Sequence, residues 1–215
     1  PGVAGCGGAA DDIDAIIDFS SRGPTADNRI KPDIAAPGHD ITGARSSVAT
    51  YSCACDPAGG TGCCQSTGVD PLNKYSAYSG TSQAAPRVAG AAAVVFDWFN
   101  DHFGAFPSPA MTKAILINGA VDVKAPDVPN FNEGWGRINL TTSLASPVGA
   151  LYTDQTTILG PTADAAAFTT SGVAQDPSRP VTVTLVWTDP AGAVSCNPCL
   201  VNDLDLLLTQ GATTW

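Results

Sequence analysis

Ser82 stands in a setting that suits a nucleophile. It is the third residue of the heptapeptide 80–86 (Gly-Thr-Ser-Gln-Ala-Ala-Pro), which leads into an alanine-rich run of helical periodicity. A serine that attacks a carbonyl group needs an exposed Oγ and backbone N–H groups that can hold the developing oxyanion. The head of a helix supplies both, because its first N–H groups have no intrahelical partner and its dipole favours negative charge. The alternative is an ordinary helix cap, the commonest role of a serine before a helix.

A second set of polar residues, Asn202, Asp203 and Asp205, lies in a predicted strand. On a strand the two aspartates point to the same face, about 7 Å apart, so both could reach one hard cation. Calcium would suit such oxygen ligands. The alternative is a pair of solvent-facing acids that protects a hydrophobic strand from edge-to-edge pairing.

Seven cysteines are present, and four of them lie close together, as the doublets Cys53/Cys55 and Cys63/Cys64. Neighbours so close in sequence rarely pair with each other, because disulfide geometry strains so small a ring. We therefore expect two disulfides, each joining one doublet to the other, in either of two pairings. A zinc site of four thiolates is the competing interpretation, but zinc ligands are usually two to four residues apart within each half of a site.

The remaining cysteines are consistent with an oxidising compartment. Cys196 and Cys199 flank Asn-Pro, a turn-forming pair, and are expected to close their own small loop. Cys6 is then left without a partner in this sequence. Asn139 begins an Asn-Leu-Thr triplet, a glycosylation acceptor that gives weak support to the same compartment.

Two helices are expected in the first part of the chain. Over residues 82–100 apolar residues recur at helical spacing, and so many are alanine that we expect a buried, closely packed helix. Pro86 lies near its first turn, where proline is best tolerated. The second helix is predicted to begin near Ser108 or Pro109 and to end at Gly119.

Composition divides the chain after residue 147. Before that point, short apolar runs alternate with loops and helices and predict strands at 15–19, 33–36 and 41–45. After it, Thr, Val and Leu dominate, and turn signals separate two strand candidates at 181–187 and 204–209. We therefore predict an α/β domain over residues 1–147 and the start of an all-β sandwich or jelly-roll domain over residues 148–215.

Charge and hydropathy exclude some classes of partner. The formal net charge of −10 repels phosphate backbones and anionic lipid surfaces, so we expect no binding of nucleic acid or of membrane surfaces. The longest apolar stretch, residues 88–96, is well short of the roughly 20 residues of a membrane span. No signal peptide is visible, and the first residue is expected to lie inside a domain.

The heptapeptide 80–86 resembles the Gly-Thr-Ser-x-Ala-x-Pro nucleophile motif of the subtilisin-like serine proteases, the subtilases. Further segments resemble that family in the same order, so that the resemblance covers nearly the whole chain. Those similar to its catalytic domain are residues 19–24, 31–38, 88–90 and 134–139. Those similar to the β-domain of some large secreted subtilases are residues 185–190 and 200–206.

The resemblance implies a subtilisin-like parallel sheet flanked by helices, with residues 1–147 as its C-terminal part and 148–215 as a truncated β-sandwich. It implies that Ser82 is the nucleophile of a Ser-His-Asp triad. Because the triad order in this fold is Asp, His, Ser, the other two residues and the oxyanion asparagine are expected before residue 1. The chain alone is then expected to be inactive. His39 and His102 lie outside the family's His-Gly motif and are interpreted as surface residues.

The leading interpretation is therefore a secreted endopeptidase, extracellular or in a vacuole or lysosome, that acts on protein or peptide substrates. No cofactor is expected for catalysis, and a structural Ca²⁺ is considered because related β-domains are often stabilised by calcium. The family usually has Met or Ala where Gln83 stands, a change expected to alter packing rather than chemistry. A non-catalytic, subtilase-like secreted binding module is the alternative. An α/β-hydrolase esterase is excluded, since Gly-x-Ser-x-Gly would need glycine in place of Ala84.

Overall fold

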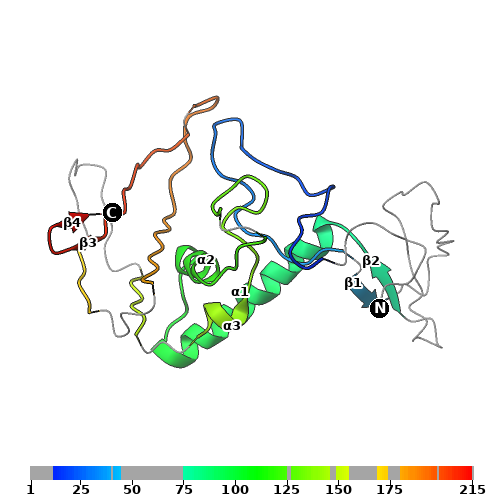
Figure 1. Ribbon diagram of the computed structural model, residues 1–215, viewed down its shortest axis with the longest axis horizontal. Helices are drawn as coiled ribbons and strands as arrows, with labels where there is room; N and C mark the ends of the chain where they lie inside the picture. Colours follow the sequence, from blue (N-terminus) through cyan, green and yellow to red (C-terminus); the bar gives the residue numbers. More distant parts are fainter. Residues whose placement is uncertain are drawn as a thin grey trace. The chain divides into compact units, whose positions relative to one another are not determined.

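The computed structural model describes residues 12–39, 41–44, 75–124, 127–145, 149–154, 169–173, 180–197 and 199–214 (Figure 1). The chain divides into two compact units. The first comprises Pro1–Pro24, Ile30–Ala91 and Ala120–Ile138. The second comprises Thr25–Arg29, Ala92–Gly119 and Asn139–Trp215.

The first unit contains an antiparallel pair of strands that leads into the longest helix. β1 (Ile41–Ala44) pairs with β2 (Tyr75–Tyr78), and Ile41 lies opposite Tyr78. Figure 1 shows β2 running into the head of α1. The strand predicted at 41–45 is confirmed to within one residue.

The helix α1 (Thr81–Phe103) confirms the prediction of a helix over residues 82–100. Its most buried side chains, Ala91, Val95 and Phe99, are 4%, 0% and 6% exposed. They recur every four residues, which is the spacing of one face of an α-helix. Gly104 directly follows the last residue of the helix, and its N–H donates to the carbonyl of Asn100 at 2.8 Å.

The second unit holds α2 (Pro109–Asn118) and α3 (Leu140–Ser143). Ser108 caps α2 by accepting a hydrogen bond from the N–H of Met111 at 3.0 Å, and Gly119 follows the last turn, as predicted. The Thr142 hydroxyl donates to the Gly119 carbonyl and so joins α3 to the end of α2.

The first residue of the glycosylation triplet serves as a helix cap. Asn139 accepts hydrogen bonds from the N–H groups of Thr141 and Thr142 through its side-chain oxygen. The residue is half-buried, whereas an acceptor for glycosylation is expected in an exposed loop. The structure therefore adds no support to that use of the triplet.

Several predicted strands do not form. Residues 15–19 make turns and extended chain, and residues 33–36 contribute one parallel bridge, Ala35 with Arg137. That bridge is the only parallel pairing among the described residues, which otherwise contain two antiparallel strand pairs and two isolated antiparallel bridges.

The predicted β-sandwich is likewise missing from the described part of the chain. Residues 181–187 form no ladder, and the hairpin of β3 (Thr209–Gln210) and β4 (Thr213–Thr214) is the only strand pair there. Strand propensity becomes a strand only where a second backbone pairs with it and a face is covered. Neither happens at Val181, Val183 and Leu185, which are 59%, 46% and 40% exposed.

The cysteine predictions have two outcomes. Cys196 and Cys199 form a disulfide, which confirms the small loop around Asn-Pro. Cys6 and the four cysteines expected to cross-link, Cys53, Cys55, Cys63 and Cys64, lie outside the described residues. Among the helices described, none has the length and apolar character needed to cross a membrane.

Candidate active site

The segment before Gly38 connects two distant parts of the first unit. Its Ala35 donates through N–H to the carbonyl of Gly136 at 2.8 Å and accepts from the N–H of Ile138 at 2.9 Å. At its end, the carbonyl of Gly38 accepts from the N–H of Gly80 at 2.7 Å. Backbone hydrogen bonds thus join the segments that resemble subtilases at 31–38, 80–86 and 134–139.

The turn that carries Ser82 depends on two glycines. Gly80 has φ +155°, a conformation that residues with a side chain rarely adopt. Gly38 packs directly against that turn. A Cβ atom on Gly38 would lie 2.8 Å from the carbonyl oxygen of Gly80 and 3.2 Å from the Cβ of Ala84. A side chain at position 38 would therefore displace the turn.

Ser82 is the second residue of α1, and its side chain is exposed. The N–H of Gln83 donates to the carbonyl of Gly80 at 3.0 Å, whereas no described residue accepts from the N–H of Ser82. Pro86 lies inside the helix and has no N–H to donate to the carbonyl of Ser82. The N–H of Ser82 thus has no acceptor among the described residues, and it can bind an oxyanion.

A pocket of about 360 Å³ lies beside the serine. β1 and β2 form one side of it and the first turns of α1 the other. The lining residues are Ile41, Gly43, Tyr78, Ser82, Gln83, Pro86 and Arg87.

Neither histidine forms a described interaction with Ser82. His39 follows Gly38 and stacks on Phe19, with ring centroids 6.5 Å apart. His102 lies 20 residues further along α1 than Ser82, which is about 30 Å of helix, so it cannot act as the base for that serine. Its Nδ1 lies 2.7 Å from the carbonyl oxygen of Trp98, and its side chain is exposed.

An acidic cluster lies in the first unit and was not expected from the sequence. The carboxylates of Asp122, Asp127 and Glu133 offer oxygen atoms that lie within 4.8 Å of one another. Glu133 is only 3% exposed and accepts from the N–H of Val123 at 2.8 Å and from Nδ2 of Asn130 at 3.0 Å. These bonds give the cluster a structural role in the loop between residues 122 and 133. Acidic residues are seldom buried, so the sequence offered no signal for it.

The structure gives the three predicted calcium ligands, Asn202, Asp203 and Asp205, different surroundings. Asp203 and Asp205 are exposed, but neither belongs to a group of three potential ligands within the described residues. Asn202 is half-buried and bound to Asp189, which accepts from its N–H at 3.0 Å and its Nδ2 at 2.7 Å.

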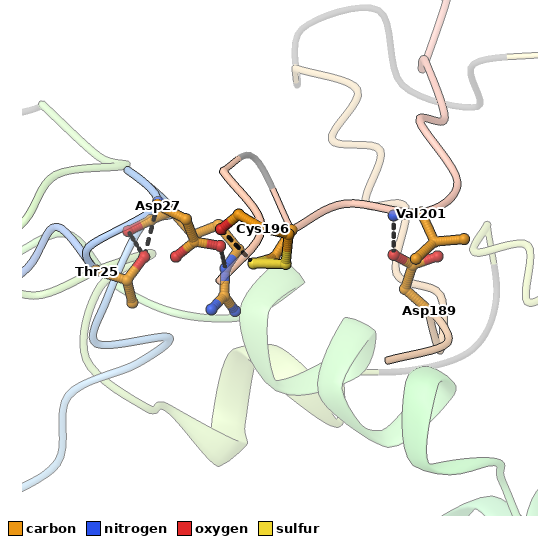
Figure 2. A network of polar contacts seen from close by, with 7 residues as sticks. Thr25, Asp27, Asp189, Cys196 and Val201 are labelled. Carbon is orange, nitrogen blue, oxygen red and sulfur yellow. Dashed lines mark hydrogen bonds and ion pairs between the residues drawn. A yellow bond between two sulfur atoms is a disulfide. The ribbon is translucent and has the colours of Figure 1, made fainter. Parts of the chain in front are cut away.

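The sequence predicted only a turn at Asp189 and Pro190, and the structure gives Asp189 a further role. Figure 2 shows its carboxylate facing Val201, whose N–H donates to it at 2.7 Å. That hydrogen bond, together with those from Asn202, lowers the pKa of Asp189 below its usual value. Asp189 therefore holds the turn that precedes the two exposed aspartates.

The sequence model of the Subtilase family matches residues 8–136. The Dictyostelium discoideum "Serine protease/ABC transporter B family protein tagA" is 32% identical over 210 residues, 88% of this chain and 11% of that protein. The Arabidopsis thaliana "Subtilisin-like protease SBT4.3" is 36% identical over 146 residues, 66% of this chain and 18% of that protein. Among solved structures, the Clostridium perfringens CspB protease matches 59% of this chain and 22% of its own, at 26% identity and a TM-score of 0.41.

The chain thus spans between a tenth and a fifth of the length of the two relatives matched by sequence. The family match covers more than half of it and includes the serine turn, the pocket beside it and the segments that hydrogen-bond to them. The chain belongs to the subtilase family.

Proposed function

We propose that the protein containing this chain is a serine endopeptidase and that Ser82 is its nucleophile. The observation that carries the proposal is a network of backbone hydrogen bonds that joins three distant segments at the turn before Ser82. In that turn the Ser82 side chain is exposed and its N–H is available to a ligand. Peptides and proteins are the proposed substrates, as family membership suggests. Loss of peptide hydrolysis on replacement of Ser82 tests the proposal. Neither the described residues nor the comparisons favour a non-catalytic binding module.

In the proposed mechanism, a histidine from elsewhere in the protein removes the proton from Ser82 Oγ, and an aspartate orients that histidine. Oγ attacks the carbonyl carbon of the scissile peptide bond, and the carbonyl oxygen becomes an oxyanion. The N–H of Ser82 donates a hydrogen bond to that oxyanion, together with a second donor outside this chain. The histidine then protonates the leaving amine, and water hydrolyses the acyl-enzyme. The histidine and the aspartate are proposed to precede residue 1.

We further propose that residues 148–215 belong to a β-domain that follows the catalytic domain. The alignment with the tagA protein supports this, because it covers 88% of the chain, more than residues 1–147 contain. The disulfide of Cys196 and Cys199 supports the proposal that the protein is secreted or lies in a vacuole or lysosome, since disulfides persist in oxidising compartments.

A structural calcium ion bound by Asp203 and Asp205 is part of the same proposal. The donor set fits, because both aspartates carry exposed carboxylates and Asn202, bound to Asp189 through its amide nitrogen, keeps its carbonyl oxygen. Calcium would supply no chemistry to peptide hydrolysis. These residues would hold the ion and so stabilise the folded β-domain.

Calcium is therefore expected to raise the melting temperature of the full-length protein. A ligand that binds only the folded state adds about 2.7 kcal/mol at a hundredfold excess over its dissociation constant. The double variant Asp203→Asn/Asp205→Asn should lose that increase. The matched control Asp97→Asn/Asp101→Asn, which alters two exposed aspartates of α1, should keep it. A wild-type melting temperature that responds to neither calcium nor a chelator would contradict the site.

Replacing Gly38 by alanine is expected to lower kcat/KM at least about tenfold. The Cβ of the alanine would displace the turn that positions Ser82. Small displacements of a reacting group cause large losses of rate. Peptide hydrolysis by the full-length variant measures the effect. Gly90→Ala is the matched control, since a Cβ there meets nothing within 4 Å and alanine favours the helix. Equal kcat/KM values for Gly38→Ala and Gly90→Ala would contradict the role of Gly38.

A further inference from the structure

We propose that Arg87 makes the pocket beside Ser82 selective for substrates that carry an acidic side chain close to the scissile bond. The inference rests on the proposed function of Ser82. It concerns the class of substrate and leaves the chemistry at the serine unchanged.

Arg87 is placed to meet a substrate bound at Ser82. It lines the same pocket and is the only charged residue among the described residues that do so. Gln83 and Arg87 are four residues apart on α1, so they share one face of the helix. Helical side chains also point back toward the N-terminus of their helix. The long side chain of Arg87 is therefore directed along the turn that begins at Ser82.

The charge of Arg87 is available to a ligand. Its side chain is exposed, and no carboxylate in the described part of the chain forms an ion pair with it. The chain has 20 acidic and 10 basic residues, yet none of the acidic residues that the structure describes is paired with this arginine beside the nucleophile. A guanidinium group offers a planar set of donors that matches a carboxylate in two parallel hydrogen bonds.

Distance limits where in the substrate the acidic residue can lie. Ser82 and Arg87 are separated by about 7.5 Å along the helix axis. An extended substrate advances about 3.3 Å for each residue. Arg87 can therefore reach side chains within about three residues of the scissile bond, which Ser82 attacks.

The test uses the full-length protein and matched peptides that carry Glu, Gln or Lys at each of three positions on either side of the scissile bond. At one of these positions we expect kcat/KM for the Glu peptide to be about fivefold higher than for the Gln peptide. That factor is the upper range of the effect of an ion pair that is open to water. Arg87→Gln should abolish the preference and Arg87→Glu should turn it toward Lys. Arg87→Lys should retain part of it, because lysine keeps the charge without the planar donors.

The control variant Lys124→Gln removes an exposed positive charge that does not line the pocket and should leave the preference unchanged. Salt gives a second measurement. Raising NaCl from about 0.1 M to about 1 M shortens the Debye length from about 10 Å to about 3 Å and should reduce the wild-type preference.

Failure of this inference and failure of the proposed function are distinguishable. Equal rates for Glu and Gln peptides at every position, with Ser82 labelled by a fluorophosphonate, would overturn the inference alone. A preference for Glu that survives in Arg87→Gln would also overturn it. No labelling of Ser82 and no hydrolysis of any peptide would overturn the proposed function.

Discussion

Replacing Ser82 by alanine in the full-length protein is expected to lower kcat for peptide hydrolysis by about 10⁶-fold, the effect of removing the nucleophile from a subtilisin. Alanine removes the oxygen that forms the acyl-enzyme. The expected KM is close to the wild-type value, because the hydroxyl acts mainly in the chemical step.

Two controls separate chemistry from folding in this experiment. Ser82→Ala should melt within a few degrees of the wild type, since the Ser82 side chain is exposed. Ser171→Ala, which alters another exposed serine, should keep full activity. A Ser82→Ala variant that retains turnover within tenfold of wild type would contradict the assignment of the nucleophile.

Replacing Glu133 by alanine is expected to lower the free energy of unfolding by about 2 kcal/mol, because one buried donor would lose its acceptor, which costs about 1–3 kcal/mol, and one half-buried donor would keep only its bond to Asp127. Those donors are the N–H of Val123 and the Nδ2 group of Asn130. Glu133 also directly precedes Gly134, whose N–H and carbonyl pair with the backbone of Asn130 at 3.0 Å. The same substitution should therefore loosen the segment that hydrogen-bonds to residues 33–38.

Denaturant unfolding of the full-length protein measures this loss, and Glu133→Gln provides a graded control. Glutamine keeps one acceptor oxygen and places an NH₂ group against the second donor, so we expect about half the loss. A midpoint for Glu133→Ala equal to that of the wild type would show that the buried carboxylate does not hold the loop.

The features that could be predicted from the sequence depend on residues close together in the chain. Helix periodicity and capping residues located α1 and α2, with Ser108 and Gly119 at the ends of the latter. The pair Cys196 and Cys199 enclosed its own turn. The exposed position of Ser82 followed from its place at the head of a helix. Each of these signals lies within a few residues of the feature it predicts.

The features that could not be predicted depend on partners far away in the chain. Residues 181–187 have strong strand propensity, but a strand forms only where another backbone pairs with it. Glu133 is buried because Val123 and Asn130 turn their donors toward it, an arrangement that no local pattern signals. Gly38 packs against Gly80 through a long separation in sequence, so its role required the structure.

The measurement that tests the central claim most directly is reaction of the full-length protein with a fluorophosphonate probe, followed by peptide mapping with mass spectrometry. The serine oxygen forms a bond to phosphorus, the phosphorus–fluorine bond breaks, and the serine proton leaves with fluoride. We predict one modified peptide, with the adduct on Ser82, and no adduct in Ser82→Ala. An adduct on a different residue, or peptide hydrolysis with Ser82 unmodified after complete inhibition, would contradict the assignment of Ser82 as the nucleophile.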